Sequence, residues 1–228
     1  MTAARSREIP RWYGRRTGRK LRPGRQRLMR DRLPGLRADP AVGDPSAMFP
    51  EPVDDIWMEI GFGAGEHLAG QAVRHPGIGF VGCEPFVNGV AALLAQIEDM
   101  GLRNIRVFDD DARLLLSELP DACLGRLYVL YSDPWPKVRH HNRRLTVAEN
   151  LSEFARLLRP DAEFRFATDH PEFASWTLER VLRQGDFHWT AASPADWREA
   201  PDDWIETRYE GKARADGRAP VYLNFRRR

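Results

Sequence analysis

Cysteine and lysine are scarce in this chain of 228 residues, and long apolar stretches are lacking. Two cysteines, Cys83 and Cys123, are too few for a disulfide scaffold or a cysteine-rich zinc site. No apolar stretch approaches the roughly 18 residues that a membrane-spanning helix needs. The N-terminus has no apolar core of a secretion signal and too little serine to favour a mitochondrial transit peptide. We therefore expect a reduced, cytoplasmic protein without a metal site or a membrane segment.

Charge is distributed unevenly along the chain, although the net charge is only +2. Residues 1–37 contain 13 Lys and Arg but only two acids, whereas the remaining residues contain 22 basic and 31 acidic side chains. Such asymmetry indicates a basic segment that binds a polyanion, attached to an acidic body. A solubilising tail without a partner is the alternative.

The basic segment carries aromatic residues and glycines between its arginines, including Trp12 and Tyr13. This pattern suits contacts with nucleic-acid phosphates and occasional stacking of bases. Residues 39–53 are rich in Pro, Asp and Ala and look like a linker. We therefore divide the chain into a flexible RNA-binding arm (1–38), a linker (39–53) and a folded domain (54–228). The candidate phosphate contacts of the arm are Arg15, Arg16 and Arg19.

From residue 54 onward, short apolar runs alternate with helical patterns. Strands are predicted at 56–60, 79–83, 105–108, 127–131, 164–168 and 221–225. Helices are predicted at 66–73, around 90–94, at 146–158 and at 171–184. This alternation predicts an α/β fold with a doubly wound, mostly parallel sheet and helices on both faces. Ligands of such sheets bind beyond the C-terminal ends of the strands.

A glycine-rich turn, Glu59-Ile-Gly-Phe-Gly-Ala-Gly-Glu66, follows the first predicted strand. It differs from a dinucleotide-binding turn because its third glycine is at 65 and an acid stands at 66. Acids on both sides of the turn suit a cationic ligand better than a pyrophosphate. S-adenosylmethionine fits, with Gly61, Gly63 and Gly65 allowing close backbone approach and Glu59 facing its ammonium or sulfonium. A tight turn without a ligand is the alternative.

Acids also follow the second and third predicted strands. Glu84 is placed to accept hydrogen bonds from both ribose hydroxyls, although alone it would be interpreted as an exposed loop acid. Asp111 fits best a contact with the adenine amino group. The same aspartate can instead cap a helix, and both roles can hold together.

The loop after the fourth predicted strand reads Ser132-Asp-Pro-Trp-Pro-Lys137 and continues into a basic run that ends at Arg144. Two prolines around Trp135 give a rigid loop of the kind that positions a reacting base. Asp133 stands where it would face both a methyl donor and an incoming base. Two histidines in the run lack the further ligands of a zinc site, so we assign them to a patch that binds phosphate. The candidate phosphate contacts are Arg139, His140, Arg143 and Arg144.

Two later polar stretches are less specific on their own. Asp169, after the fifth predicted strand, is either substrate-facing or a helix cap. The stretch from Thr207 to Lys212 would by itself be assigned to a loop.

Together these motifs resemble the bacterial tRNA (guanine-N7)-methyltransferase family. The resemblance spans about residues 56–212, and Ser132 departs from the proline that is usual in the family. It rests on the glycine-rich turn, Glu84, Asp111-Ala112, Asp133-Pro-Trp-Pro-Lys137 with its basic run, Ala167-Thr-Asp169 and Thr207-Arg-Tyr-Glu210.

The resemblance implies a class I S-adenosylmethionine-dependent fold that methylates N7 of guanosine 46, in the variable loop of tRNA. It implies donor contacts at Glu59, Glu84, Asp111 and Asp133, with Asp133 as the catalytic residue. Implied substrate contacts are Lys137, Asp169, Thr207, Arg208, Tyr209 and Glu210. We expect a monomer or homodimer that binds tRNA and needs neither a metal ion nor an obligatory protein partner.

Three other functions are open to the same residues. Asp-Pro-Trp-Pro partly resembles the loops of methyltransferases that act on exocyclic amines, but here Trp135 displaces one proline and a basic run follows. A non-catalytic RNA-binding protein would not need the donor-side acids. A nicotinamide-dependent oxidoreductase is disfavoured by the glycine spacing and by the acids around the turn.

Overall fold

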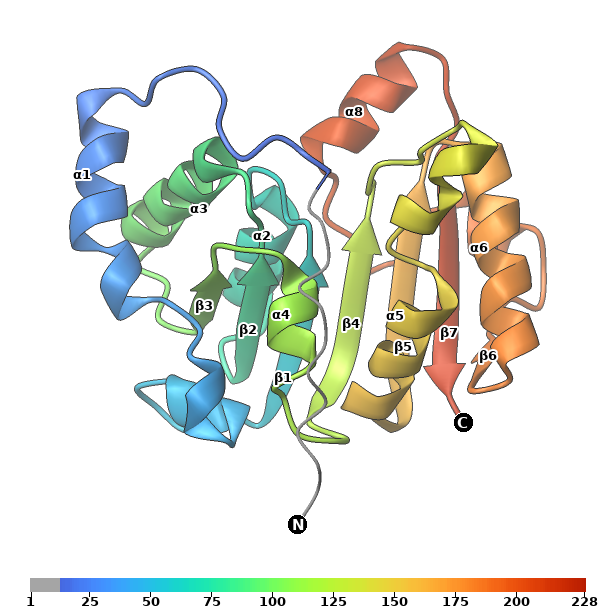
Figure 1. The fold of residues 1–228 in the computed structure, drawn as a ribbon, viewed down its shortest axis with the longest axis horizontal. Coiled ribbons are helices and arrows are strands. Elements are labelled where there is room, and N and C mark those ends of the chain that lie inside the picture. The colour runs from blue at the N-terminus through green and yellow to red at the C-terminus, as the bar shows by residue number, and fades with distance from the viewer. Residues whose placement is uncertain (1–12) are drawn as a thin grey trace.

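The computed structural model describes residues 13–228, which form a seven-stranded sheet flanked by helices (Figure 1). The strands are β1 (Asp55–Ile60), β2 (Ile78–Cys83), β3 (Ile105–Phe108), β4 (Leu124–Leu130), β5 (Leu158–Thr168), β6 (Phe187–Trp189) and β7 (Val221–Arg227). They lie in the order β3-β2-β1-β4-β5-β7-β6. β1 to β5 are parallel, while β7 is antiparallel to both β5 and β6. The predicted doubly wound, mostly parallel α/β fold is confirmed.

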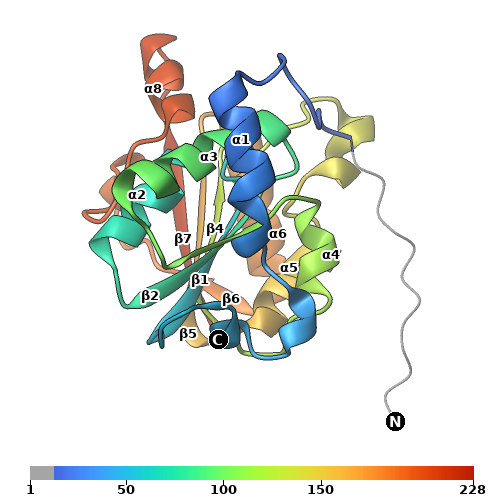
Figure 2. The same cartoon turned by 90° about the vertical axis from the view of Figure 1, so that its left-hand side faces the viewer.

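Helices cover both faces of the sheet, which Figure 2 shows from the side. One face carries α2 (Glu66–Arg74) and α3 (Val87–Met100), and the other carries α4 (Ala112–Leu116), α5 (Ala148–Leu157) and α6 (Pro171–Gln184). Alternate residues of β1 supply the two cores, with Met58 on the α4–α6 side and Trp57 on the α2–α3 side. The shorter α7 (Ala195–Arg198) and α8 (Arg208–Ala215) lie in the chain between β6 and β7. Among residues 13–228, no helix is long and apolar enough to cross a membrane.

The chain changes direction across the sheet between β1 and β4. β2 and β3 extend the sheet on one side of β1, and the chain then returns to place β4 on the other side. The loops after β1 and β4 therefore separate at the C-terminal edge and leave room between them. This is the edge where the sequence placed its functional turns.

The second half of the segment expected to be a flexible arm is folded onto the body. Helix α1 (Pro23–Asp31) packs against α3, and Leu28 and Leu33 are buried in the core on that side. Further along, the backbone N–H of Ala38 donates to the carbonyl of Val107 at 2.9 Å. Burial of these two leucines therefore helps to hold this part of the arm against the folded domain. Residues 1–12, including Trp12, lie outside the described residues.

Several boundaries differ from those expected. The predicted linker over 39–53 contains two short 3₁₀ turns (Pro40–Val42 and Pro45–Met48), and its Phe49 is buried against the core. β5 begins at Leu158, earlier than the residue 164 that was expected. Its first part contains an irregular stretch at Asp161, whose φ is 63°, and the pairing with β4 skips this stretch. The strand β6 and the helix α8 were not predicted.

Candidate active site

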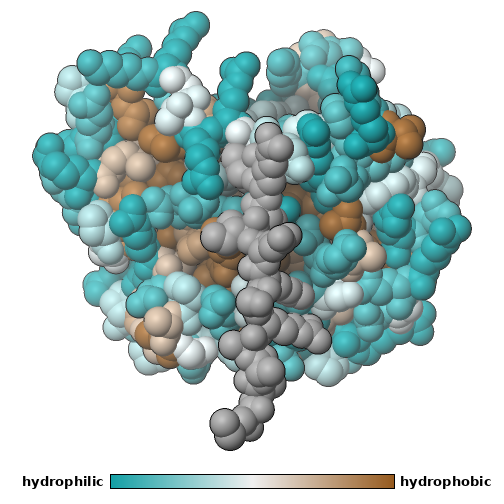
Figure 3. Space-filling model, viewed as in Figure 1, coloured by the Kyte–Doolittle hydropathy of each residue, from teal (hydrophilic) through white to brown (hydrophobic). Residues whose placement is uncertain are grey.

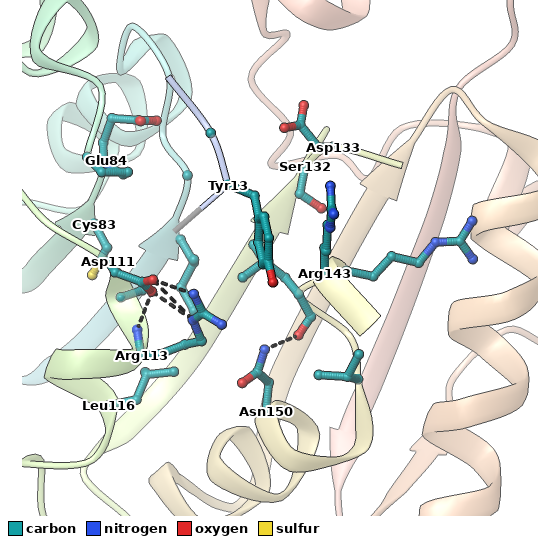
Figure 4. Close-up of a pocket in the computed structure, with 18 of the residues that line it drawn as sticks. Tyr13, Cys83, Glu84, Asp111, Arg113, Leu116, Ser132, Asp133, Arg143 and Asn150 are labelled. Atoms are coloured by element: carbon teal, nitrogen blue, oxygen red, sulfur yellow. Dashed lines mark hydrogen bonds and ion pairs between the residues drawn. The ribbon is translucent and has the colours of Figure 1, made fainter. Parts of the chain in front are cut away.

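A cleft of about 1710 Å³ opens at the C-terminal edge of the sheet. In the view of Figure 1, the surface has hydrophobic patches surrounded by hydrophilic residues (Figure 3). In Figure 4, Glu84 and Asp111 lie on one side of the cleft, Asp133 and Arg143 lie on the other, and Tyr13 lies between them. The fold therefore brings residues from four separate segments of the chain around one space.

The turn between β1 and α2 forms part of the cleft and depends on glycine. Gly61, Gly63 and Gly65 have φ values of 78°, 59° and 86°, a region that other residues rarely adopt. A Cβ atom on Gly63 would also lie 2.8 Å from the ring of Tyr209. The turn thus exposes bare backbone to the cleft and leads into the N-terminal end of α2, which favours negatively charged groups.

Glu84 lies where β2 ends and its carboxylate accepts two backbone hydrogen bonds. The N–H of Gly63 donates to Oε2 at 2.8 Å, and the N–H of Phe86 donates to Oε1 at 2.9 Å. Burial raises the pKa of Glu84, the two hydrogen bonds oppose that rise, and the charges of Asp133 and Glu59 add to it. The three carboxylates therefore influence one another around the cleft.

Asp111 and Glu59 are both buried and already have partners within the protein. Asp111 caps α4 by accepting from the N–H of Arg113 at 3.1 Å, and its carboxylate also pairs with the Arg113 guanidinium at 2.5 Å. The capping alternative of the sequence analysis is thus present, while an adenine contact stays a prediction. Glu59 is 2% exposed and its Oε2 lies 2.8 Å from Nδ1 of His67.

The loop after β4 presents Asp133 at the open side of the cleft. Tyr131 and Trp135, on either side of it, have positive φ values of 50° and 43°, which cost energy for residues other than glycine. Within residues 13–228, no hydrogen bond or ion pair engages the Asp133 carboxylate. Surrounding protein atoms partly remove it from water and raise its pKa. A strained loop therefore holds an unpaired carboxylate toward the cleft.

Arg144 supports this loop from inside the protein. We had expected it to contact phosphate, and its burial corrects that expectation. Its side chain is wholly buried, donates to the carbonyl of Pro134 at 2.8 Å and pairs with Glu172 at 2.6 Å. The guanidinium also lies over the rings of Phe173 and Trp176. In this arrangement Arg144 is inaccessible to RNA, because packing and hydrogen bonds use its whole guanidinium.

A second group of residues, Tyr13, Trp135 and Arg143, joins the arm to the same loop. The rings of Tyr13 and Trp135 are 6.2 Å apart, edge to face. The Arg143 guanidinium lies 4.1 Å from the centre of the Tyr13 ring and 5.0 Å from that of Trp135. Further along the arm, Arg16 pairs with Asp110 at 2.5 Å. The arm therefore crosses the mouth of the cleft.

Comparisons with known proteins agree with this geometry. A family model described as "Putative methyltransferase" matches residues 54–223. A tRNA (guanine-N(7)-)-methyltransferase of Rhodospirillum rubrum is 50% identical over 228 residues, covering 97% of this chain and 89% of that protein. The protein of the same name from Brucella melitensis is 46% identical over 220 residues, covering 95% and 94%. This chain belongs to the tRNA (guanine-N7)-methyltransferase family.

Solved structures share the fold of this family member at low sequence identity. A 16S rRNA methyltransferase, KamB, has a TM-score of 0.53 at 20% identity, covering 77% of this chain and 88% of that chain. An antibiotic-related methyltransferase has a TM-score of 0.52 at 17% identity, covering 76% and 87%. These similarities concern the fold alone, which is the class I S-adenosylmethionine-dependent type.

The expected tRNA contacts of the methyltransferase have different surroundings in the structure. Lys137 and Arg139 are exposed beside the loop of Asp133. Desolvation, and then the charges of Arg143 and its basic neighbours, lower the pKa of His140. Asp169 is paired with Arg218. An RNA contact by Asp169 therefore requires it to share or exchange this partner.

Residues 207–210 form the start of α8, not a loop. Thr207 caps the helix, and the buried Glu210 accepts hydrogen bonds from Tyr222 at 2.5 Å and from the Trp204 indole at 2.6 Å. Arg208 and Tyr209 are exposed, and the Tyr209 ring covers Gly63. Substrate contact by these four residues stays a prediction. In the structure Thr207 and Glu210 hold Tyr209 in place.

Sequence reasoning missed His67 and the placement of Tyr13 in the cleft. His67 lies one residue into α2 and is 1% exposed. The one available signal was that His67 directly follows the acid at the end of the glycine turn. This position did not reveal that Glu59 is its partner. Tyr13 was predicted to stack on bases, but nothing in the sequence indicated that it reaches the cleft.

Proposed function

We propose that this chain transfers the methyl group of S-adenosylmethionine to N7 of guanosine 46, in the variable loop of tRNA. The family supports the reaction. We assign the reaction to this cleft because three carboxylates lie close together there. Burial raises the pKa of Glu84, and the charges of Asp133 and Glu59 raise it further. Carboxylates gathered near the glycine turn attract ligands of positive charge to that part of the cleft. The donor's sulfonium and ammonium groups are such ligands.

The donor-side residues fit S-adenosylmethionine. The turn at Gly61, where an added Cβ would meet nothing within 4 Å, gives room for close approach, and Glu84 retains accepting capacity for ribose hydroxyls beyond its two backbone partners. We assign Asp111 to the adenine amino group and Glu59 to the ammonium end. When bound, S-adenosylmethionine supplies a methyl group on a positively charged sulfur.

Asp133 acts on the acceptor by charge and position. Guanine N7 has a lone pair in the neutral base, so no residue has to remove a proton before it attacks. Positive charge develops on the purine as N7 gains the methyl group, and a nearby carboxylate in a partly desolvated site stabilises it. We assign Asp133 to hold the guanine edge and stabilise this charge, with the strained loop setting its position.

The basic surface beside the cleft suits the backbone of tRNA. N7 lies in the deep groove of an RNA helix, which side chains enter poorly, so the target base must come from a loop or leave its stack. We assign phosphate contacts to exposed cations on both sides of the mouth, and the Tyr13 ring to stacking. The exposed cations are Arg15, Arg16, Arg19, Lys137 and Arg139, and the partly buried Arg143 joins them.

Matched tRNA transcripts test the position. An unmodified transcript with guanosine at nucleotide 46 should gain one methyl group per molecule, found as 7-methylguanosine after digestion. A transcript that differs only by adenosine at 46 should gain none. Equal methylation of both transcripts would show that another guanosine is the target.

Donor binding should weaken as the pH falls. The bound cation favours the carboxylate form of Glu84, whose pKa in the free protein is raised above the ordinary value of about 4.3. Donor affinity should therefore be highest above this raised pKa and should decline as the pH falls through it, at a pH above ~4.3. Calorimetric titration from neutral pH down to about pH 5 measures this decline. The Glu84→Gln variant should bind more weakly and with a flatter profile, and an equal slope in both proteins would contradict the assignment.

Gly89→Ala should weaken donor binding about tenfold or more. Gly89 lies in α3, and a Cβ atom there would clash with the carbonyl oxygen of Gly63, so the turn would have to move. The matched control is Gly24→Ala in α1, where an added Cβ meets nothing within 4 Å. Calorimetry with S-adenosylhomocysteine compares the two variants, and unchanged affinity in Gly89→Ala would show that the turn adapts freely.

The proposed reaction also bears on partners and location. A tRNA substrate implies a cytoplasmic enzyme, and methyl transfer of this kind needs neither a metal ion nor a second protein. A monomer or homodimer remains the expected state.

A further inference from the structure

Glu59 and His67 form a buried pair beneath the glycine turn. Glu59 is 2% exposed and His67 is 1% exposed, with Oε2 and Nδ1 2.8 Å apart. The imidazole packs against the rings of Tyr128 and Trp204, with centroids 4.8 and 5.3 Å away. A buried histidine in contact with two aromatic rings has little freedom to turn away from the carboxylate.

Gln71, one helical turn beyond His67, determines where the imidazole proton lies. Its Nε2 is 2.8 Å from the backbone carbonyl oxygen of Asp203 and 3.3 Å from Nε2 of His67. A carbonyl oxygen only accepts, so the amide nitrogen of Gln71 must face it, because the flipped amide would bring two acceptor oxygens together. The same nitrogen then donates to His67 Nε2. His67 therefore carries its single proton on Nδ1, directed at Glu59.

This arrangement engages only one of the two oxygens of Glu59. A neutral imidazole donates one hydrogen bond without cancelling the charge of the carboxylate. No hydrogen bond or ion pair in the described part of the chain engages Oε1 of Glu59. The carboxylate also belongs to the group of charges that acts on Glu84 from beneath the cleft.

We propose that His67, oriented by Gln71, is a positioning residue that holds the Glu59 carboxylate toward the ammonium end of the methyl donor. The inference rests on the proposed donor contact of Glu59. Metal-bound histidines in other proteins are oriented in the same way by a second hydrogen bond. Here the direction is reversed, since an amide orients the histidine and the histidine orients the carboxylate.

Binding of two ligands to the full chain tests this role without turnover. S-adenosylhomocysteine carries the amino-acid end, whereas 5′-methylthioadenosine lacks it. His67→Phe keeps a ring between Tyr128 and Trp204 but donates no hydrogen bond, so it should weaken S-adenosylhomocysteine about tenfold. Binding of 5′-methylthioadenosine should change less than about twofold, since its contacts are elsewhere.

A conservative variant and a control complete the test. His67→Asn places its amide nitrogen where Nδ1 lies and should restore most of the lost affinity. His75→Phe, at the end of the same helix and without contact to Glu59, should bind both ligands normally. In the unaltered protein, nitrogen NMR of the imidazole should show a proton on Nδ1 of His67 and none on Nε2.

The outcomes separate this inference from the donor contact on which it rests. If Glu59→Gln weakens S-adenosylhomocysteine but His67→Phe does not, the positioning role is wrong and the donor contact stands. If Glu59→Gln has no effect, both are wrong. Equal weakening of the two ligands by His67→Phe would mean that His67 only supports the fold, and a proton on Nε2 would overturn the role of Gln71.

Discussion

Asp133→Asn lowers kcat about 100- to 1,000-fold, and donor affinity falls far less. Asn keeps the size and the hydrogen-bonding oxygen of the side chain but removes its charge. The Asp133 carboxylate is partly desolvated and has no ion pair with the described residues, so its charge is available to the developing purine cation. Single-turnover methyl transfer to tRNA, with enzyme and donor in excess, measures this loss at the chemical step.

The control for this variant is Asp99→Asn. Asp99 is exposed at the end of α3, away from the cleft. The same change of charge there should leave the rate of methyl transfer and the donor affinity unaltered. A parallel titration with S-adenosylhomocysteine measures the donor affinity of each protein. If Asp133→Asn lost affinity as strongly as it lost rate, Asp133 would serve to bind the donor and not to stabilise the product.

Arg144→Met lowers the free energy of unfolding by about 3 kcal/mol. The substitution removes the hydrogen bond to the Pro134 carbonyl and the stacking on Phe173 and Trp176, all within a fully buried site. Glu172 is half exposed, so water replaces much of its lost ion pair and that pair adds little. Urea titration followed by tryptophan fluorescence measures the change. Arg139→Met, on the exposed side of the same loop, should leave stability within about 0.5 kcal/mol.

The pH dependence of stability offers an independent check on Arg144. Its hydrogen bond holds the pKa of Glu172 below the ordinary value. A depressed acid stabilises the fold above its ordinary pKa, and this contribution is lost as the pH falls through the lowered pKa. The unaltered protein should therefore lose this small contribution below about pH 4.3, and Arg144→Met should not. If the free energy of unfolding fell equally with pH in both proteins, the ion pair would not contribute to stability.

The sequence predicted the fold well where local patterns were unambiguous. The apolar run of β4 and the glycine turn after β1 identified the parallel core and the edge that holds the cleft. The helix at Pro171–Gln184 has the bounds that were expected. β6 has only three residues and gives no periodic signal, so it was missed. α1 was missed because its buried Leu28 is surrounded by arginines, and its stability comes from packing on α3.

Prediction of the site was limited to which residues are present, not how they are used. The acids at strand ends were found because parallel strands bring their C-terminal ends together. Burial could not be inferred within the basic run, so Arg144 was grouped with Arg143, although Arg144 is buried against Glu172 and Arg143 lies over the Tyr13 ring. Partners distant in the chain, such as His67 for Glu59, follow only from the packing of α2 on the sheet.

The most direct test of the account is to locate the methyl group chemically. The purified protein is incubated with S-adenosylmethionine and unmodified tRNA, and the RNA is then cleaved by chemistry specific for 7-methylguanosine. The account predicts a single cut at nucleotide 46, absent when the donor is omitted. Methyl transfer without any such cut would place the methyl group on another atom and contradict the account.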